Sequence, residues 1–186
     1  MMKLNLGCGV NKIEGYLNID KYPSGNPDML MDLEEIPWKF DENSVDEILL
    51  NHVLEHLGAE VEVFFSIIKE MYRVCKNGTI IQINVPHPRH DNFMNDPTHV
   101  RVITPTLLGL FSKKNCMQWK EMGAANSPLA LYLNVDFEIE NVRVTLEQEY
   151  LDAFKSGKIS ESEVNDLMKR QNNIASEYQI TWKVIK

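Results

Sequence analysis

Two glycines and an aspartate near the N-terminus have the spacing of a nucleoside-binding site. Gly7 and Gly9 follow the short apolar run at residues 3–6, and Asp20 ends the next apolar run, residues 16–19. Glycine lets a ligand approach the backbone where a Cβ would collide with it, and a carboxylate at a neighbouring strand end can accept both hydroxyls of a ribose. These residues predict a cofactor that carries a nucleoside.

The residues after Gly9 indicate which nucleoside cofactor this is. A dinucleotide site has a third glycine at the start of a helix, whose N-terminus binds the pyrophosphate. Here the chain reads Gly7-Cys8-Gly9-Val10-Asn11-Lys12, without that third glycine. A ribose acceptor without a pyrophosphate site favours S-adenosylmethionine over NAD.

Polar side chains also follow the third and fourth apolar runs, residues 28–31 and 45–50. Carboxyl ends of parallel strands point into the ligand crevice, so Asp32 and Leu33 are predicted to bind an adenine amine and ring face. The alternative for Asp32 is a turn cap. Asn51 and His52 begin the segment after the fourth run, where His52 either lines the cofactor site, which we favour, or caps a helix.

Glu55 and His56 lie about one helical turn beyond His52. An exposed helix face explains these two residues as well as any functional role does.

Three of the five histidines lie in a polar loop at residues 86–101. One interpretation is a metal site, since imidazole and carboxylate groups bind zinc or iron. Because the ligands would share a single irregular loop, we expect no metal there. Acceptor binding or proton transfer is the favoured interpretation, and structural hydrogen bonding is the third. The residues in question are His87, His90, Asp91, Asp96 and His99.

Strands and helices must alternate to bring these residues together. Apolar runs predict strands at residues 3–6, 16–19, 28–31, 45–50 and 79–85, and an apolar stripe predicts a helix over residues 59–75. This alternation is typical of an α/β fold with a Rossmann-like, doubly wound, mostly parallel sheet.

The second half of the chain predicts one short helix, two strands and a helical insertion. Thr104 and Pro105 have the types of an N-cap and first helical residue, for a helix that reaches about Phe111. Residues 136–146 and 178–185 alternate as strands do. The polar residues 147–177 lie between them, and a capping box of Ser160 and Glu163 predicts a helix at residues 160–171, outside the sheet core. We expect a single domain over residues 1–186.

Composition excludes several classes of protein. The chain has 186 residues, 19 Lys and Arg against 27 Asp and Glu, and a formal net charge of −8. Its basic residues are scattered, so bulk nucleic acid is a poor partner. Three widely spaced cysteines support neither a disulfide framework nor a zinc knuckle. With no apolar run of membrane-spanning length and no signal peptide pattern, we expect a cytoplasmic protein.

Several segments together resemble the class I S-adenosylmethionine-dependent methyltransferases, in particular the short bacterial and phage-type members known as type 11. The resemblance covers about the first 113 residues, and the two closing strands are similar to the final antiparallel hairpin of the family. Its motifs are Leu4-Asn5-Leu6-Gly7-Cys8-Gly9, Asp20, Asp32-Leu33 before Ile36-Pro37-Trp38, Phe40-Asp41-Glu42-Asn43-Ser44-Val45-Asp46-Glu47-Ile48, His52-Val53-Leu54-Glu55-His56-Leu57 and Asp96-Pro97-Thr98-His99.

The resemblance implies where the cofactor binds. Gly7 and Gly9 would contact the methionine moiety and the ribose, and His52 the methionine side. Together with the residues inferred above, the predicted cofactor contacts are Leu6, Gly7, Cys8, Gly9, Asp20, Asp32, Leu33, Asn51 and His52.

The chain departs from the family pattern in two places. Only ten residues, Val10 to Ile19, separate Gly9 from Asp20, where the family usually has a helix, so a loop or a single turn is expected. About thirty residues are inserted between the last two strands, and a lid, an interface or no function are all open for them.

The predicted function is methyl transfer from S-adenosylmethionine to an unidentified small or medium-sized acceptor, sugar-like molecules included. A hydroxyl or ammonium acceptor must lose a proton, for which a histidine is suited. His99 is the first predicted base, His52 is the second, and Asp96 would orient His99. The alternatives are a non-catalytic module that binds S-adenosylmethionine or S-adenosylhomocysteine, and a metal-dependent hydrolase that uses the histidine loop. The sequence leaves the oligomeric state open.

Overall fold

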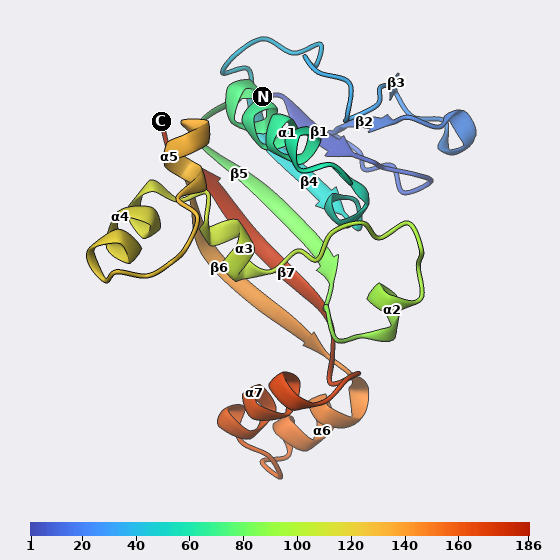
Figure 1. The fold of residues 1–186 in the computed structure, drawn as a ribbon. Coiled ribbons are helices and arrows are strands. Elements are labelled where there is room, and N and C mark those ends of the chain that lie inside the picture. The colour runs from blue at the N-terminus through green and yellow to red at the C-terminus, as the bar shows by residue number, and fades with distance from the viewer.

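A single seven-stranded sheet forms the centre of the protein in the computed structural model, which describes residues 1–186 (Figure 1). The strand order is β3-β2-β1-β4-β5-β7-β6; β1 to β5 pair in parallel, and β7 is antiparallel to both β5 and β6. The predicted mostly parallel, Rossmann-like sheet with a closing antiparallel pair is confirmed. The strands are β1 (Lys3–Leu6), β2 (Leu17–Asp20), β3 (Met29–Leu30), β4 (Val45–Asn51), β5 (Cys75–Pro86), β6 (Phe137–Leu146) and β7 (Ala175–Val184).

Helices occupy most of the connections after β4. The α-helices are α1 (Val61–Val74), α2 (Asp91–Met94), α3 (Pro105–Gly109), α4 (Lys113–Glu121), α5 (Leu129–Leu133), α6 (Gln148–Lys155) and α7 (Glu161–Arg170). Two 3₁₀ turns, η1 (Pro23–Gly25) and η2 (Leu54–His56), lie near the strand ends. Thr104 caps α3 through Leu107 N–H with Pro105 at its first turn, as predicted. None of the helices combines the length and apolar character needed to cross a membrane.

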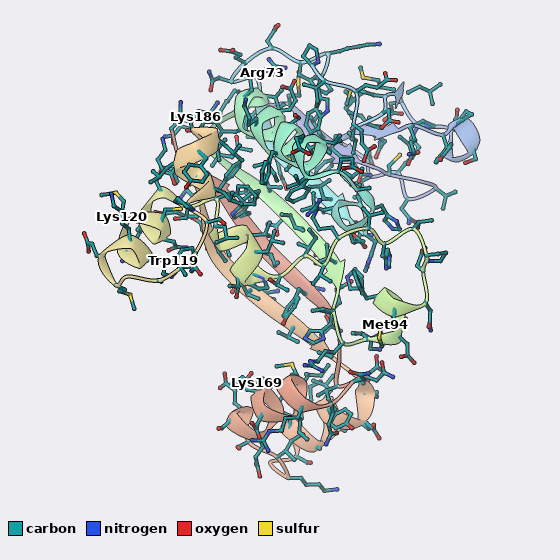
Figure 2. The ribbon with its side chains drawn as sticks, viewed as in Figure 1. Arg73, Met94, Trp119, Lys120, Lys169 and Lys186 are labelled. Carbon is teal, nitrogen blue, oxygen red and sulfur yellow. The ribbon has the colours of Figure 1, made fainter.

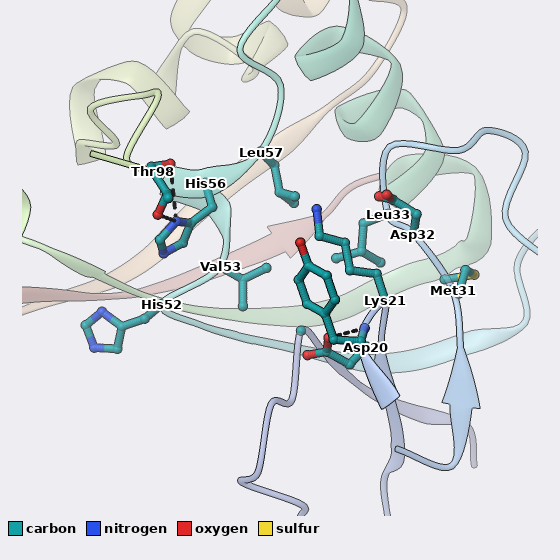
Figure 3. A pocket seen from close by; sticks show the side chains of 12 residues that line it. Asp20, Lys21, Met31, Asp32, Leu33, His52, Val53, His56, Leu57 and Thr98 are labelled. Atoms are coloured by element: carbon teal, nitrogen blue, oxygen red, sulfur yellow. Dashed lines mark hydrogen bonds between the residues drawn. The ribbon is translucent and has the colours of Figure 1, made fainter. Parts of the chain in front are cut away.

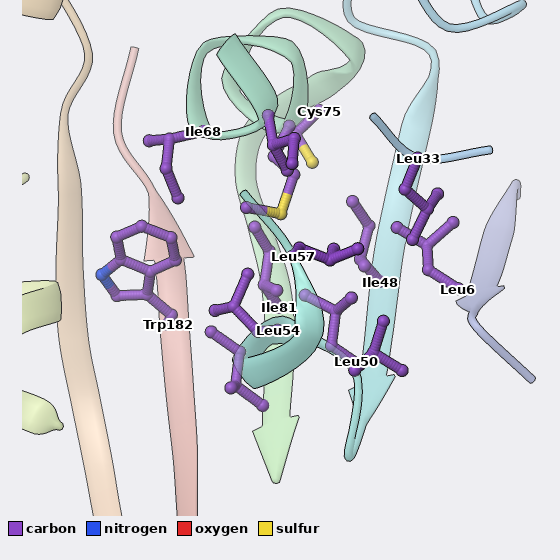
Figure 4. Packing of buried hydrophobic residues seen from close by; sticks show 14 of the residues in the cluster. Leu6, Leu33, Ile48, Leu50, Leu54, Leu57, Ile68, Cys75, Ile81 and Trp182 are labelled. Carbon is purple, nitrogen blue, oxygen red and sulfur yellow. The ribbon is translucent and has the colours of Figure 1, made fainter. Parts of the chain in front are cut away.

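The hydrophobic core lies between α1 and one face of the sheet (Figure 4). The apolar stripe of α1, including Phe64 and Ile68, packs in one cluster with Ile81 of β5 and Trp182 of β7, all at most 2% exposed. The Trp182 ring also stacks on Phe137, with 3.8 Å between ring centroids. Alternate residues of the same strands on the opposite face are only partly buried. The sheet is thus anchored mainly from the α1 side.

The connection from β1 to β2 contains no helix, as the short spacing predicts. Two buried asparagines hold this loop against the sheet. Asn5 Nδ2 donates to Asn18 Oδ1 (2.9 Å) and to the Asn11 carbonyl (3.0 Å), and Ile13 N–H donates to Asn18 Oδ1 (2.8 Å). Asn18 Nδ2 in turn donates to Asp28 Oδ2 at 2.7 Å. A polar network therefore takes the place of a packed crossover helix.

This network leads to a stability prediction for Asn18. Replacing Asn18 with alanine removes the acceptor of the buried Asn5 amide and of the partly buried Ile13 N–H, so we expect the free energy of unfolding to fall by about 2 kcal/mol or more. Urea denaturation measures the difference. Asn141→Ala is the matched control, because Asn141 is exposed on β6 and a change there should stay within about 0.5 kcal/mol. Equal stabilities for the two variants would contradict the role of the network.

The insertion between β6 and β7 consists of α6 and α7 and projects beyond the sheet (Figure 1). α7 begins with the predicted capping box, in which Ser160 and Glu163 bond reciprocally, and only Val164 is buried. This confirms the predicted helix outside the sheet core. In Figure 2, Lys169 of α7 and Met94 of α2 lie toward one end of the sheet, and Arg73 and Lys186 lie at the other.

The starts of two strands differ from expectation. β7 begins at Ala175, three residues before the predicted start at residue 178. Residues 75–78 look like the C-terminal cap of the helix, but α1 ends at Val74 and β5 begins at Cys75. Gly78 has a φ of 82°, so the left-handed residue lies within the strand segment and not at the helix end. All three cysteines are free and buried.

Candidate active site

A cavity of about 340 Å³ opens at the carboxyl ends of β1, β2 and β4. The strand order reverses between β1 and β4, since the chain runs from β1 outward to β3 and returns to β4 on the other side. Ligands of open α/β sheets bind at such a switch point. The volume is within the range of small-molecule sites. The lining residues are Gly7, Asp20, Lys21, Tyr22, Met31, Asp32, Leu33, His52, Val53, His56, Leu57 and Thr98 (Figure 3).

Gly7 and Gly9 both require glycine, for different reasons. Their φ angles are 66° and 51°, in the left-handed region that side chains rarely adopt. A Cβ on Gly7 would lie 2.5 Å from Val53 Cγ2, whereas a Cβ on Gly9 would meet nothing within 4 Å. Gly7 therefore permits close packing of β1 against the segment after β4, whereas Gly9 is required by its backbone conformation alone.

Asp20 is held so that its carboxylate has acceptor capacity left for a ligand. Gly9 N–H donates to Oδ2 and Tyr22 N–H donates to Oδ1, each at 2.8 Å. A carboxylate offers about four lone-pair positions, so about two stay free. Asp20 lines the cavity (Figure 3), and its remaining lone pairs fit the two hydroxyls of a ribose.

Asp32 and Leu33 line the cavity on the side away from His56 (Figure 3). Asp32 Oδ1 accepts from Glu34 N–H at 3.0 Å, so this residue does cap a turn, which was the alternative role. Its second oxygen has no hydrogen bond within the protein and is free for an amine donor. Leu33 is 5% exposed and forms an apolar wall. The turn thus fixes the carboxylate at the cavity.

Four predicted cofactor contacts lie outside the lining of the cavity. Leu6 is fully buried in the core, Cys8 is 4% exposed, and Asn51 accepts a hydrogen bond from Asn84 on β5. Gly9 adjoins the site through its bond to Asp20. Sequence reasoning gave no role in the site to Lys21, Tyr22, Met31, Val53, Leu57 and Thr98, and it left His56 without one.

His52 lies at the edge of the cavity with its ring turned away from Asp20 and Asp32 (Figure 3). Its φ of 55° places it in the left-handed region directly after β4. His52 Nε2 is 2.8 Å from Glu177 Oε2, and Nδ1 is 3.4 Å from Glu55 Oε1. The carboxylates of Glu55 and Glu177 raise the pKa of His52 above its ordinary value. His52 is thus oriented toward acidic groups rather than toward the cavity.

Asp96 acts on His56 through Thr98. The Thr98 hydroxyl donates to Asp96 Oδ1 at 2.6 Å, and the same hydroxyl oxygen is 2.9 Å from His56 Nδ1. Since the hydroxyl proton is used by Asp96, His56 Nδ1 carries a proton and donates it to Thr98. Asp96 Oδ2 is 3.9 Å from His99 Nε2, which is too long for the hydrogen bond by which Asp96 was expected to orient His99.

His99 lies behind His56, outside the lining of the cavity. Its side chain is 7% exposed, and Nδ1 donates to the Phe93 carbonyl at 2.8 Å. The rings of His56 and His99 meet edge to face with 4.6 Å between centroids. His99 thus reaches the cavity through His56.

The other loop histidines lie apart from this pair. His87 packs against Tyr178 on β7, and His90 Nε2 is 3.1 Å from Glu147 Oε1, beside α6. The five-residue metal set considered from the loop sequence is therefore not assembled as one group.

Glu55 contradicts the exposed-face interpretation of its segment. The segment forms the 3₁₀ turn η2 instead of an α-helix, and Glu55 is completely buried. Neither of its carboxylate oxygens has a hydrogen-bond partner. The Glu55 carbonyl accepts from Val100 N–H and Arg101 N–H at 2.9 and 3.1 Å, which brings the histidine loop against η2.

Comparisons with known proteins agree with this geometry. A family model described as a methyltransferase domain matches residues 8–83. A SAM-dependent methyltransferase structure from Archaeoglobus fulgidus superimposes with a TM-score of 0.61 at 22% identity, over 98% of this chain and 85% of that one. The YcgJ protein of Bacillus subtilis gives 0.55 at 12% identity, over 100% and 92%.

A SAM-dependent methyltransferase structure from Methanosarcina mazei gives a TM-score of 0.52 at 16% identity, over 100% of this chain and 93% of that one. No curated protein sequence matches the chain. The matches establish the class I methyltransferase fold and confirm the resemblance seen in the sequence.

Proposed function

Because the chain carries a match to the methyltransferase domain over residues 8–83 within a class I methyltransferase fold, we propose that it transfers a methyl group from S-adenosylmethionine to a small or medium-sized acceptor. The observation that carries this proposal is Asp20. Two backbone N–H groups, those of Gly9 and Tyr22, fix its carboxylate at the cavity.

The adenosine part of the cofactor fits between the ends of β1, β2 and β3. Asp20 would accept the two ribose hydroxyls, and the free oxygen of Asp32 would accept the adenine amine while Leu33 covers a ring face. Met31 and Tyr22 also line this part of the cavity. The arrangement offers no helix N-terminus for a pyrophosphate, since the β1 to β2 connection is a loop.

The opposite end of the cavity suits the transfer step. When bound, the cofactor would supply a sulfonium methyl carbon for in-line attack by the acceptor. The acceptor–carbon bond would form as the carbon–sulfur bond breaks, and S-adenosylhomocysteine would leave with the bonding electrons. The sulfonium loses its charge in this step, so the apolar walls of Val53 and Leu57 favour it. Orientation of the acceptor provides much of the rate.

An acceptor hydroxyl or ammonium must also lose its proton, and we assign this to the imidazole pair of His56 and His99. His56 lines the cavity, and its Nδ1–H is fixed by Thr98, which leaves Nε2 unprotonated. His99 supports the His56 ring from behind. His56 lies on the far side of Val53 from Asp32 (Figure 3), so the proposed acceptor and adenine positions are separate.

Calorimetry tests the cofactor assignment. We expect the purified protein to bind S-adenosylhomocysteine and S-adenosylmethionine, and to bind NAD at least tenfold more weakly, because no group in the site serves a pyrophosphate. An affinity for NAD equal to that for S-adenosylhomocysteine would overturn the proposal. Incorporation of labelled methyl groups into candidate acceptors then tests the transfer itself.

A further inference from the structure

We propose that Glu55, His56 and His99 form a binding site for a divalent transition metal ion of the zinc type, at the acceptor end of the cavity. One ligand atom from each of these residues lies within 4.8 Å of the others. Glu55 and His56 come from η2, and His99 comes from the loop after β5. Donors from two separate segments therefore converge, which a set confined to the loop would not do.

The buried carboxylate of Glu55 is the main observation. Its residue is 0% exposed, and both carboxylate oxygens lack a hydrogen-bond partner. A buried, unpaired charge is strongly unfavourable, and buried charges in proteins are usually paired or coordinate metals. No lysine or arginine forms an ion pair with Glu55. A cation bound at this position would supply the missing partner.

Both histidines present the nitrogen that a metal needs. His99 donates its Nδ1–H to the Phe93 carbonyl at 2.8 Å, and His56 donates its Nδ1–H to the Thr98 hydroxyl, which Asp96 holds. Each ring is therefore the tautomer with a free lone pair on Nε2. Metal-ligating histidines typically donate their other N–H to a carbonyl or carboxylate in this way.

The donor set indicates the class of metal. Two neutral imidazoles and one carboxylate suit Zn²⁺ or Fe²⁺ and not Mg²⁺, which prefers an oxygen shell. Zinc ligands lie about 2.0–2.2 Å from the ion, so the three donor atoms would have to approach each other by about 1 Å on binding. Because Glu55 is fully buried and the His99 side chain is only 7% exposed, this approach requires a small movement of η2 toward the loop.

Pairing with a protonated His52 ring is the competing explanation of how the buried Glu55 charge is compensated. His52 Nδ1 lies 3.4 Å from Glu55 Oε1, longer than the 2.7–2.9 Å of a charge-assisted hydrogen bond, and it lacks hydrogen-bond geometry. The other ring nitrogen of His52 is paired with Glu177 at 2.8 Å. A contact of this length compensates the negative charge of Glu55 poorly, so we favour a bound metal ion as its partner.

The position of the site suggests its use, and this step rests on the proposed function. Three protein ligands leave a coordination position open, as in catalytic zinc sites. Because His56 lines the cavity, that position would face the acceptor and could take a hydroxyl oxygen. With both Nε2 atoms on the metal, the cation would take over the role proposed for the imidazole pair: it would lower the pKa of such a hydroxyl, whose proton would pass to water before methyl transfer. This inference replaces the expectation from the sequence that no metal is bound.

The test is titration of the chelator-treated full chain with Zn²⁺ and Co²⁺ by calorimetry and visible absorption, with Mg²⁺ as the negative control. We expect one equivalent of Zn²⁺ or Co²⁺ to bind, with d–d bands for cobalt, and no heat from Mg²⁺. Glu55→Gln and His99→Ala should each weaken Zn²⁺ binding at least tenfold. His90→Gln, a matched change in the same loop, should leave it within twofold.

Folding and cofactor controls keep the outcomes distinct. Circular dichroism checks each variant, and metal-free Glu55→Gln should be at least as stable as the parent, because it removes an uncompensated charge. Two results would overturn the metal site and leave the proposed function intact. In the first, the parent binds S-adenosylhomocysteine but takes up no stoichiometric Zn²⁺ or Co²⁺. In the second, the parent and the three variants bind Zn²⁺ with equal affinity. Zinc binding without S-adenosylhomocysteine binding would support the site and contradict the function.

Discussion

Replacing His99 with alanine should lower the rate of methyl transfer about 10²–10⁴-fold, because it removes one ring of the His56–His99 pair to which we assign the proton transfer. The same variant should bind S-adenosylhomocysteine with nearly unchanged affinity. The reason is geometric, since His99 lies behind His56 and outside the lining of the cavity, whereas the ribose and adenine positions are at Asp20 and Asp32. Steady-state kinetics with an identified acceptor and calorimetry with S-adenosylhomocysteine measure the two effects.

Two further variants sharpen this prediction. His99→Gln should recover little activity, because an amide can donate a hydrogen bond but cannot take up a proton at neutral pH. His90→Gln is the matched control, since His90 pairs with Glu147 away from the cavity and its loss should leave the rate within about threefold. A tenfold loss of affinity for S-adenosylhomocysteine in His99→Ala would indicate that the loop contributes to the cofactor site and not to the acceptor site.

Replacing Asp20 with alanine should weaken binding of S-adenosylhomocysteine by about 1–3 kcal/mol, which corresponds to about 5- to 150-fold in Kd. The variant removes the acceptor of the ribose hydroxyls and frees the N–H groups of Gly9 and Tyr22. Calorimetry gives the affinity, and thermal unfolding shows how much of the change is structural.

Asp46→Ala is a matched control for Asp20. Asp46 also accepts a backbone N–H, from Met2, and pairs with Lys76, but it lies near the start of β4, at the amino ends of the parallel strands and away from the cavity. Its replacement should leave the affinity for S-adenosylhomocysteine unchanged. If Asp20→Ala affected binding no more than this control, the ribose assignment would be wrong.

Local patterns explain why much of the fold was predictable. Apolar runs locate β1, β2, β4 and β5, because a strand buried in a parallel sheet needs consecutive β-forming residues. Thr104 and Ser160 mark helix starts through side-chain bonds to residues three positions on. The start of β5 was missed because Lys76, Asn77 and Gly78 have the composition of a helix cap, and pairing with β4 overrides that local preference.

The residues that we propose for the cofactor end were readable in the sequence, because Gly7, Asp20 and Asp32 lie at or just after strand ends. The acceptor end was not. Glu55 looks like a residue on a solvated helix face, and its burial depends on hydrogen bonds from Val100 and Arg101, which are distant in the sequence. The role of Thr98 between Asp96 and His56 likewise requires the loop and η2 to meet. Such contacts between distant segments leave no periodic signal.

The α6–α7 insertion is joined to the histidine loop by hydrogen bonds. Asn173 N–H donates to the Arg89 carbonyl, Asn173 Oδ1 accepts from Asp91 N–H at 2.9 Å, and Glu147 pairs with His90. Because of these bonds, the conformational order of the insertion depends on that of the histidine loop, and the reverse. By thermodynamic linkage, a ligand that orders the loop must stabilise the insertion by the same coupling free energy.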